Sequence, residues 1–196
     1  MEEKNPYELI ILGAGPAGLT GSIYASRYGI KNIVLGALPG GQVSESYLID
    51  NYPGMEDISG TELAKKIFTH AQKYGTEFII AKAESVKKTP DGFEVELENK
   101  AKIKGKTVLL ATGNQRKKLN IPGEAAFQGK GVSYCATCDG FFYKEKTVAV
   151  IGGSDSAAGA AAHLASIAKK TFLIYRKKEL RCEEYWKKIL AKEKKI

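Results

Sequence analysis

The chain has 196 residues, of which 43% are hydrophobic and 27% charged, and this is the composition of an ordinary globular protein. It contains no apolar run long enough to cross a bilayer and no visible signal peptide, so we expect a cytoplasmic protein with no membrane partner. The formal net charge of +8 falls almost entirely in residues 169–196, and because a basic end segment is weak support for phosphate-backbone binding, we expect no nucleic-acid partner.

The first predicted unit spans residues 8–35. Glu8–Leu12 is a short apolar run stopped by a glycine-rich turn, a pattern that predicts a buried strand. A helix is expected from this turn to Tyr28, and Asn32–Leu35 is the next strand. Together these elements predict a compact βαβ unit.

The turn itself reads Gly13-Ala14-Gly15-Pro16-Ala17-Gly18. Its first glycine permits the tight turn, its second lets the backbone approach a pyrophosphate, and its third allows close helix–strand packing. The helix start then offers unpaired N–H groups to the phosphates. Because the motif follows a strand and opens a helix, we predict a dinucleotide site, and a simple packing turn is the less favoured alternative. Gly36 stands where an acidic residue usually ends the second strand, so recognition of the ribose must differ in detail.

The middle of the chain predicts a helix, a meander and a return to the core. The helix opens at residues 59–62 and stops at Gly75. Three short alternating segments separated by turn signals predict a small antiparallel meander: Glu84–Lys88, Phe93–Leu97 and Ala101–Lys104. Val108–Ala111 returns as a core strand, and Asn114–Pro122 is polar and basic enough to be a linker.

Two cysteines separated by two residues, Cys135 and Cys138, come after this linker, with Asp139 directly behind them. Such a pair can close a small disulfide or supply half of a metal site. A zinc site needs two more ligands, and the remaining candidates are scattered singly: Cys182, His70 and His163. A redox dithiol is therefore the favoured interpretation, ahead of a metal site and of two ordinary buried cysteines, and a reducing cytoplasm suits such a pair.

The second predicted unit repeats the first. A strand, a helix and a strand are expected at Thr147–Ile151, Ser156–Ala168 and Thr171–Tyr175. Gly152 and Ala157 fit the first and third positions of the glycine fingerprint. Ser154 replaces the middle glycine, where its side chain would either crowd a pyrophosphate or hydrogen-bond to it.

Three cations follow the last strand of this unit: Arg176, Lys177 and Arg181. Cations at this place suit the 2′-phosphate of NADP rather than the bare hydroxyl of NAD. A solvated basic helix start is an almost equally favoured alternative for these three residues taken alone.

Six segments occur in a characteristic order: Gly13–Gly18, Gly40-Gly41-Gln42, Asn51-Tyr52-Pro53-Gly54, Ala111-Thr112-Gly113, Cys135–Asp139 and Tyr175–Arg181. This series resembles that of the low-molecular-weight thioredoxin reductases. The resemblance covers essentially the whole chain, and the run Cys-Ala-Thr-Cys-Asp-Gly is its most specific part.

The resemblance implies an α/β fold of two Rossmann-like three-layer nucleotide-binding domains, both incomplete in this chain. An FAD domain with the antiparallel meander would occupy residues 1–115, and an NAD(P)H domain with the redox pair would occupy residues 116–196. The resemblance further implies electron transfer from NADPH through FAD and the cysteine pair to thioredoxin or a thioredoxin-like protein. It also implies a homodimer in the complete form.

The resemblance also implies roles for individual residues. The FAD side would comprise Gly13, Gly15 and Gly18 at the pyrophosphate, Gly41, Gln42 and Asn51 beside the flavin, and Ala111 and Gly113 along the cofactor. The NADPH side would comprise Gly152, Ser154, Ala157, Arg176, Lys177 and Arg181. Cys138 would lie nearer the flavin with Cys135 as its partner, and Asp139 would protonate a departing thiolate, which speeds disulfide exchange.

The chain departs from the family pattern mainly in the NADPH half. Besides Ser154, Tyr175 replaces a histidine, and Gly159-Ala160 replaces acidic helix residues. Family members also continue further and carry a Gly-Asp motif, whereas no Gly-Asp dipeptide occurs here, so we expect a truncated reductase. Two alternatives remain open: a related FAD dithiol oxidoreductase with another acceptor, and a catalytically incomplete fragment.

Overall fold

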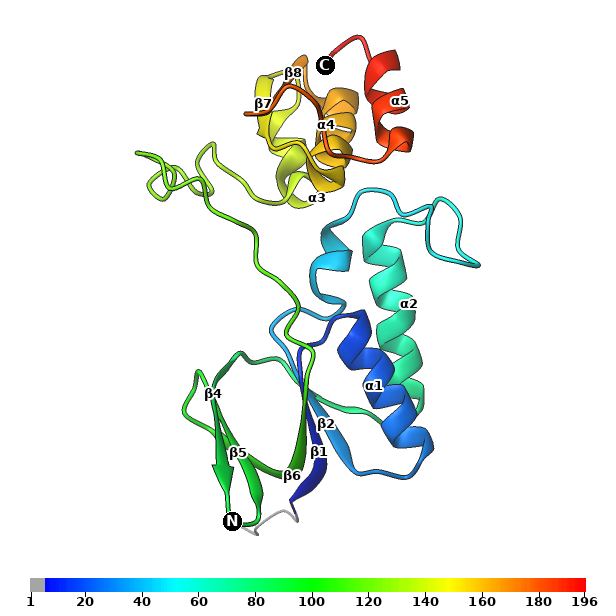
Figure 1. Ribbon diagram of the computed structural model, residues 1–196, viewed down its shortest axis with the longest axis vertical. Coiled ribbons are helices and arrows are strands. Elements are labelled where there is room, and N and C mark those ends of the chain that lie inside the picture. Colours follow the sequence, from blue (N-terminus) through cyan, green and yellow to red (C-terminus); the bar gives the residue numbers. More distant parts are fainter. Residues whose placement is uncertain (1–5) are drawn as a thin grey trace. The chain divides into compact units, whose positions relative to one another are not determined.

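The computed structural model describes residues 6–196 (Figure 1). Residues 1–5, where a signal peptide would begin, lie outside the described part. The chain divides into two packing units. The first contains the residues up to Ser44 and Gly60–Asn114, and the second contains Glu45–Ser59 and Gln115–Ile196. Within residues 6–196, none of the helices combines the length and apolar character that crossing a membrane requires.

The first unit is built on a six-stranded sheet with the strand order β3-β2-β1-β6-β5-β4. The neighbours from β3 to β6 run parallel, whereas β4, β5 and β6 are antiparallel to one another. The strand bounds are β1 Tyr7–Leu12, β2 Asn32–Leu35, β3 Glu77–Ile79, β4 Ala83–Thr89, β5 Gly92–Leu97 and β6 Lys102–Leu110. This sheet therefore combines the predicted βαβ unit and the predicted meander.

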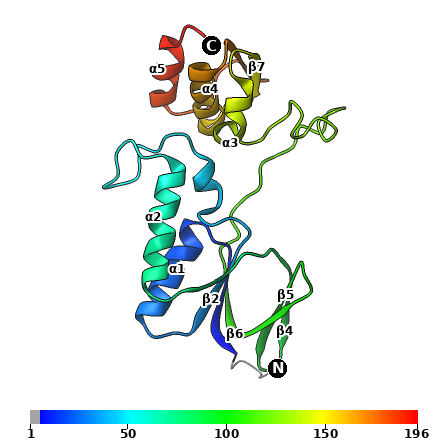
Figure 2. The same ribbon diagram turned by 180° about the vertical axis from the view of Figure 1, so that it is seen from behind.

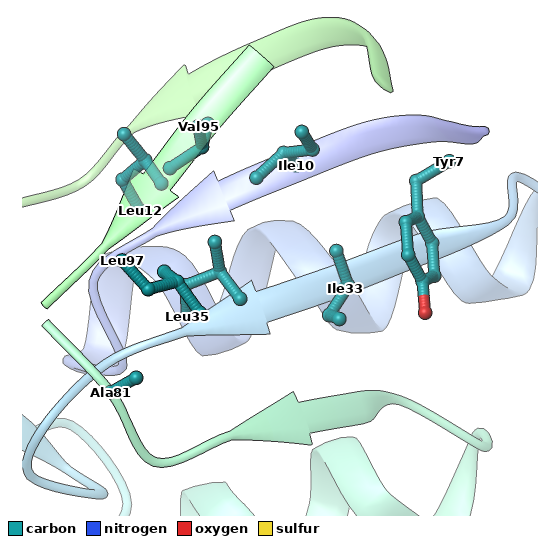
Figure 3. Close-up of a cluster of buried hydrophobic side chains, with 8 residues drawn as sticks. All are labelled: Tyr7, Ile10, Leu12, Ile33, Leu35, Ala81, Val95 and Leu97. Atoms are coloured by element: carbon teal, nitrogen blue, oxygen red, sulfur yellow. The ribbon is translucent and has the colours of Figure 1, made fainter. Parts of the chain in front are cut away.

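Three layers form in the first unit because alternate side chains of β1 and β2 point to opposite faces. Ile10 and Ile33 point toward the meander and pack with Val95 and Leu97, all at most 1% exposed (Figure 3). On the other side lie the helices α1, Pro16–Arg27, and α2, Gly60–Lys73 (Figures 1 and 2). The predicted α/β class with a three-layer nucleotide-binding unit is confirmed.

Two details of the first unit differ from the sequence prediction. β6 is one continuous strand where two separate strands were expected, because its first half pairs with β5 and its second half with β1. Gly105 lies where the partners change, and a Cβ there would come within 2.7 Å of the Ile10 side chain. β3 was not predicted at all, since its three residues, one exposed and two half-buried, are too few to show a periodic pattern.

The second unit contains a two-stranded parallel sheet, with one face covered by a helix. β7, Thr147–Ile151, pairs with β8, Lys170–Ile174, and α4, Asp155–Ile167, connects them. Two shorter helical turns carry the cysteine motif, α3 at Ala136–Asp139 and η2 at Gly140–Tyr143, and the last helix is α5 at Glu184–Lys192. The predicted second βαβ unit is therefore present.

Small residues on α4 allow close packing. Ala158, Ala161 and Ala165 are at most 1% exposed on the face toward the sheet and its neighbours. A Cβ at Gly159 would lie 3.3 Å from the indole ring of Trp186 on α5. The absence of an acidic side chain at residue 159 thus has a packing explanation, because Trp186 of α5 lies against Gly159.

Candidate functional site

The Gly13–Gly18 turn in the first unit leaves a bare stretch of backbone at the start of α1. Gly13 has φ +116°, and a Cβ on it would overlap the carbonyl oxygen of Ala111. A Cβ on Gly18 would overlap the Gly13 carbonyl oxygen, so both positions require glycine. Gly15, by contrast, has φ −76° and would have no neighbour within 4 Å of a Cβ.

Gly15 is also the residue that precedes the first turn of α1, with Pro16 directly after it. Because glycine has no side chain, nothing at this position covers the first N–H groups of the helix. Open backbone at the middle glycine and a helix start without a side-chain cap together fit a pyrophosphate. The residues of this chain therefore fit the phosphate part of a dinucleotide.

Four other predicted FAD-side residues gather around this turn in the first unit. The short helix η1 spans Gly41–Glu45. Its first residue lies close to the turn, because a Cβ on Gly41 would be 3.0 Å from the Gly15 Cα. The side-chain amide of Gln42 donates a hydrogen bond to the Asn114 carbonyl oxygen. Ala111 donates its N–H to the Leu12 carbonyl at 2.8 Å, and Gly113 has φ +65°. They lie at the carboxyl ends of the parallel strands, where ligands bind in open α/β sheets.

Asn51 lies outside this group, and Gly36 packs against the turn from the end of β2. Asn51 is exposed and belongs to Glu45–Ser59, the segment that packs with the second unit. A Cβ on Gly36 would lie 2.6 Å from the Ala14 Cβ and 2.8 Å from the Ala14 nitrogen. The missing acidic side chain at the end of β2 is therefore explained by close packing against the turn.

The second glycine turn, in the second unit, has a different surface. Gly152 has φ +152°, and a Cβ on it would lie 2.8 Å from the Cβ of Ala157, which accounts for small residues at both positions. The ring of Tyr175 covers Gly153, where a Cβ would meet it at 2.5 Å. Ser154 precedes α4, and its hydroxyl lies 3.3 Å from that of Ser156. This turn thus presents a hydroxyl where the first turn presents bare backbone.

The three predicted 2′-phosphate ligands, Arg176, Lys177 and Arg181, are all exposed. The backbone N–H of Arg181 donates to the Gly153 carbonyl oxygen at 2.7 Å, which holds the loop after β8 against the glycine turn. Within the described residues, none of the three side chains forms an ion pair. Their charges are therefore available to an anion beside this turn.

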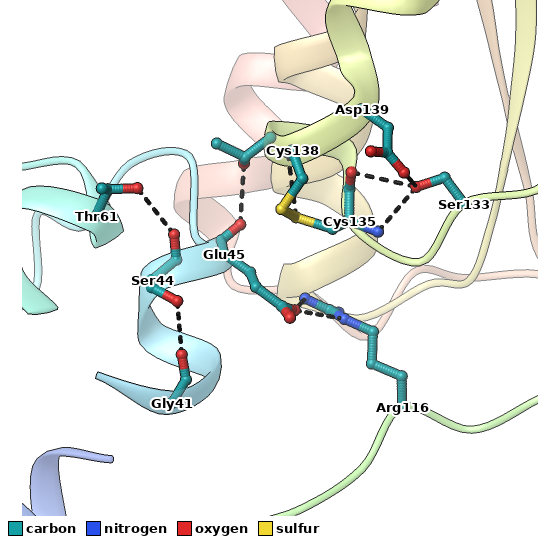
Figure 4. Close-up of a disulfide and its surroundings, with 10 residues drawn as sticks. Gly41, Ser44, Glu45, Thr61, Arg116, Ser133, Cys135, Cys138 and Asp139 are labelled. Atoms are coloured by element: carbon teal, nitrogen blue, oxygen red, sulfur yellow. Dashed lines mark hydrogen bonds and ion pairs between the residues drawn. A yellow bond between two sulfur atoms is a disulfide. The ribbon is translucent and has the colours of Figure 1, made fainter. Parts of the chain in front are cut away.

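Cys135 and Cys138 form a disulfide at the start of α3 (Figure 4). Cys135 is the residue before the helix, and its sulfur accepts a hydrogen bond from the backbone N–H of Cys138 at 3.1 Å. Cys138 is exposed and Cys135 is half-buried. The disulfide is thus held on a single helical turn with one sulfur-bearing residue open to a reaction partner.

Asp139 is held beside the disulfide by Ser133. The Ser133 hydroxyl donates to the Oδ2 atom of Asp139 at 2.6 Å and accepts from the Cys135 backbone N–H at 3.1 Å (Figure 4). Both residues are half-buried. The Asp139 carboxyl group therefore lies in a defined position at the end of α3.

The segment Glu45–Ser59, far from the cysteines in sequence, packs against α3. The Thr137 hydroxyl donates to the Glu45 carbonyl oxygen at 2.9 Å, and the Glu45 carboxylate pairs with Arg116 at 2.7 Å (Figure 4). The ring of Tyr47 lies 4.3 Å from that of His163 on α4. Burial lowers the pKa of His163, so this ring is neutral near pH 7 and packs as a structural group.

Two aromatic residues directly after the redox turn were not predicted to have a role. Phe141 and Phe142 on η2 are 75% and 72% exposed, which is unusual for phenylalanine. The signal was present in the sequence, since both follow Asp139-Gly140, but an aromatic pair in sequence does not reveal whether it is buried. In the structure both side chains are exposed and apolar, and they follow Cys138 by three and four residues in sequence.

The third cysteine stands apart from the redox pair. Cys182 is 5% exposed, and burial together with Asp155 raises the pKa of its thiol, so it is an unreactive group. Among residues 6–196, no three potential ligands from His, Cys, Asp and Glu come together as a metal site.

The sequence pattern of one family, described as pyridine nucleotide-disulphide oxidoreductase, matches residues 7–195. The chain belongs to this family. Among curated relatives, it is 39% identical over 186 residues to thioredoxin reductase of Bacillus subtilis and 43% identical over 175 residues to that of Helicobacter pylori. These alignments cover 93% and 88% of the chain, and the resemblance to thioredoxin reductases is confirmed.

A solved structure agrees with these relatives. The Lactococcus lactis thioredoxin reductase superimposes with a TM-score of 0.92 at 35% identity, covering 97% of this chain and 63% of that one. The chain spans 58% and 56% of the lengths of the two curated relatives. The activity and partners of those whole proteins are therefore proposals for this chain.

Proposed function

We propose that this chain carries the flavin-side and disulfide-bearing parts of a thioredoxin reductase. In this proposal, electrons pass from NADPH through FAD to the Cys135–Cys138 disulfide and from there to thioredoxin. Residues 1–115 form the FAD-binding part and residues 116–196 the NAD(P)H-binding part. The observation that carries the proposal is the disulfide at the start of α3 with Asp139 held directly behind it, in a chain with two dinucleotide-type turns.

The first turn supports FAD as the nucleotide nearer the N-terminus. Gly15 and the start of α1 offer bare backbone for the pyrophosphate, while Gly13 and Gly18 let the strand and helix pack closely enough to form the turn. Gly41, Gln42, Ala111 and Gly113 border the same strand ends, and Asn51 is the further residue proposed for the flavin. When bound, FAD would supply the electron pair that reduces the disulfide.

The second turn supports NADPH as the donor. Gly152 and Ala157 permit a tight turn before α4, and the Ser154 hydroxyl is available to a phosphate oxygen. Arg176, Lys177 and Arg181 are exposed cations at the end of β8, the position that distinguishes a 2′-phosphate from a hydroxyl. Their contacts to a phosphate would each contribute roughly 1.5–3 kcal/mol, which favours NADPH over NADH.

The acceptor is proposed to be a protein. Exposed aromatic side chains are enriched in protein interfaces, and Phe141 and Phe142 are exposed three and four residues after Cys138. The names of the relatives point to thioredoxin. Thiol–disulfide exchange between Cys135–Cys138 and a thioredoxin-like protein needs a proton for each departing thiolate, and we assign its delivery to Asp139. A reducing compartment such as the cytoplasm and a homodimer of the complete form remain predictions.

The test uses the purified chain with FAD, NADPH and a thioredoxin. The proposal requires flavin absorbance to remain after desalting and thioredoxin reduction to follow addition of NADPH. Cys138→Ser should keep NADPH-driven loss of flavin absorbance and abolish thioredoxin reduction, whereas Cys182→Ser, at the buried third cysteine, should retain both.

The same test separates the alternatives. Flavin that is retained and reduced without thioredoxin turnover would indicate another acceptor for the dithiol. A wild-type chain that loses its flavin on desalting would favour the catalytically incomplete fragment. Unchanged thioredoxin turnover by Cys138→Ser would remove the role assigned to the cysteine pair.

A further inference from the structure

We propose that Ser133 is a positioning residue that holds the Asp139 carboxyl group for proton delivery to the disulfide. The inference rests on the acid role proposed for Asp139. Ser133 lies two residues before Cys135 and outside the Cys-Ala-Thr-Cys-Asp motif, so that motif gives it no role. Its hydroxyl is the atom that connects the backbone at Cys135 to the side chain of Asp139 (Figure 4).

The direction of the Ser133 proton follows from the distances around its oxygen. The oxygen lies 2.6 Å from Asp139 Oδ2 and 3.2 Å from the Cys135 carbonyl oxygen, which already accepts the Asp139 backbone N–H at 3.1 Å. The shorter contact is the stronger one, so the hydroxyl donates to the Oδ2 atom of the Asp139 carboxyl group. In return it accepts the Cys135 N–H at 3.1 Å, which keeps the oxygen in place.

This arrangement determines which carboxyl oxygen of Asp139 can carry a proton toward sulfur. Since Oδ2 accepts from Ser133, a proton delivered by Asp139 would be carried on Oδ1, the oxygen turned away from Ser133 in Figure 4. Without the hydroxyl, the carboxyl group could rotate and present either oxygen in many orientations. A general acid acts well only when its proton is held in reach of the atom that receives it.

Reduction by dithiothreitol isolates this step from flavin, nucleotide and partner protein. One thiolate of the reagent forms a bond to one cysteine sulfur, the Cys135–Cys138 bond breaks, and its electron pair remains on the other sulfur. That sulfur takes the proton from Asp139, which regains one from water. The second thiol of the reagent then closes the oxidised ring and releases the first cysteine as a thiol, so that both electrons come from dithiothreitol.

The experiment measures the rate of this reduction in the full 196-residue chain near pH 7. Samples are quenched with acid, unfolded and alkylated, and mass spectrometry distinguishes one label, on Cys182, from three labels after reduction. We expect Asp139→Asn to slow reduction about 100-fold, since it removes the acid. Ser133→Ala should slow it about tenfold, the loss expected for one hydrogen bond to a charged group.

Two controls separate positioning from a general effect on structure. Ser166→Ala removes a similar serine hydroxyl bond in the same unit, from Ser166 to the His163 carbonyl at 2.7 Å, and should leave the rate unchanged. Ser133→Thr keeps the hydroxyl and should restore most of the rate. In the Asp139→Asn background, Ser133→Ala should add no further loss, because a residue that acts only through Asp139 has nothing left to position.

The outcomes are distinguishable. An unchanged rate in Asp139→Asn would overturn the acid role of Asp139 and the positioning role with it. A slow Asp139→Asn variant together with a normal Ser133→Ala variant would overturn the positioning role alone. Equal, additive losses from Ser133→Ala in both backgrounds would show that Ser133 supports the turn itself, which would also overturn the proposal.

Discussion

The two βαβ units of this chain have the same local order but different surroundings. In the first, β1 and β2 are covered by helices on one face and by the meander on the other, and Ile10 is fully buried. In the second, α4 covers one face of β7 and β8, while Ile151 and Ile174 are each 49% exposed. Similar apolar strands therefore bury very different amounts of surface, depending on the layers around them.

This difference shows that an apolar strand sequence does not by itself determine how deeply its side chains are buried. Both pairs of strands are rich in Ile, Val and Leu, and all four were predicted as strands. In the second unit the exposed side chains of β8 alternate with buried or half-buried ones, and Thr171 is fully buried. An apolar residue at an outward position contributes little stability until a further layer covers it.

The largest expected effect tests this comparison directly with one substitution in each sheet. Ile10→Ala removes a fully buried side chain between β1 and the meander and should destabilise the first unit by about 3–4 kcal/mol. Ile174→Ala removes the same atoms from a half-exposed position and should cost about 0.5–1 kcal/mol. Urea unfolding followed by circular dichroism gives both values, and fluorescence of the single tryptophan, Trp186, reports the second unit.

A large loss in Ile174→Ala would contradict the comparison. It would mean that the exposed face of β7 and β8 is covered in solution, and the urea transition would then depend on protein concentration if a second copy covers it. Equal small losses at both positions would instead mean that the meander does not form a packed layer.

A middle-sized effect distinguishes the glycines of the two turns. Gly13→Ala places a Cβ against the Ala111 carbonyl at φ +116° and should cost about 2–3 kcal/mol. Gly152→Ala meets only the Ala157 Cβ at 2.8 Å and should cost about 1–2 kcal/mol. Gly15→Ala is the matched control, since φ −76° and open space should leave stability within about 0.5 kcal/mol of wild type.

Flavin retention then sharpens the glycine comparison. Gly15→Ala should lose FAD on desalting despite normal stability, because its methyl group occupies the place proposed for the pyrophosphate. The measurement is flavin absorbance per folded chain beside the unfolding free energy. Full retention by Gly15→Ala would place the pyrophosphate elsewhere.

The smallest expected effects come from two tyrosine–glutamate hydrogen bonds, one in each unit and each 2.6 Å long: Tyr7 to Glu77 and Tyr134 to Glu124. Burial and then the Glu77 contact raise the pKa of Tyr7 from 10.0 to about 12. This raised value means that the contribution of Tyr7 to stability is complete below pH 10 and is lost as the pH rises through 12. Tyr7→Phe should therefore cost about 1 kcal/mol at pH 7 and nothing above pH 12.

The Tyr134–Glu124 bond in the second unit is expected to lose its contribution to stability at low pH, when Glu124 is protonated. Hydrogen bonds from Tyr134 and from the backbone of Leu119 and Asn120 lower the pKa of Glu124 below 4.5. Its contribution to stability is therefore present above pH 4.5 and is lost as the pH falls through the lowered value. The difference between Tyr134→Phe and wild type in urea unfolding should vanish at low pH, and a difference that grows there would contradict the assigned bond.

Local pattern was sufficient for much of the fold and less so for the site. The alternation at Phe93–Leu97 and the glycine-stopped run at Glu8–Leu12 predicted their strands, because burial on one or both faces leaves a periodic trace. β3 was not predicted because its three residues are too few to show a period. β6 was predicted as two strands because Gly105 and its polar neighbours interrupt the apolar pattern.

By itself the sequence determined the two glycine turns, the spacing of Cys135 and Cys138 and the family, since these depend on residues close together in the chain. Only the tertiary structure decided that Ser133 binds the Asp139 carboxylate and that the segment from Glu45 supports Thr137. Only the fold, likewise, showed that Phe141 and Phe142 are exposed and that Gly36 has no room for a side chain. The physical reason is that hydrogen bonds, exposure and steric room depend on which distant residues become neighbours, and a linear pattern carries no record of that.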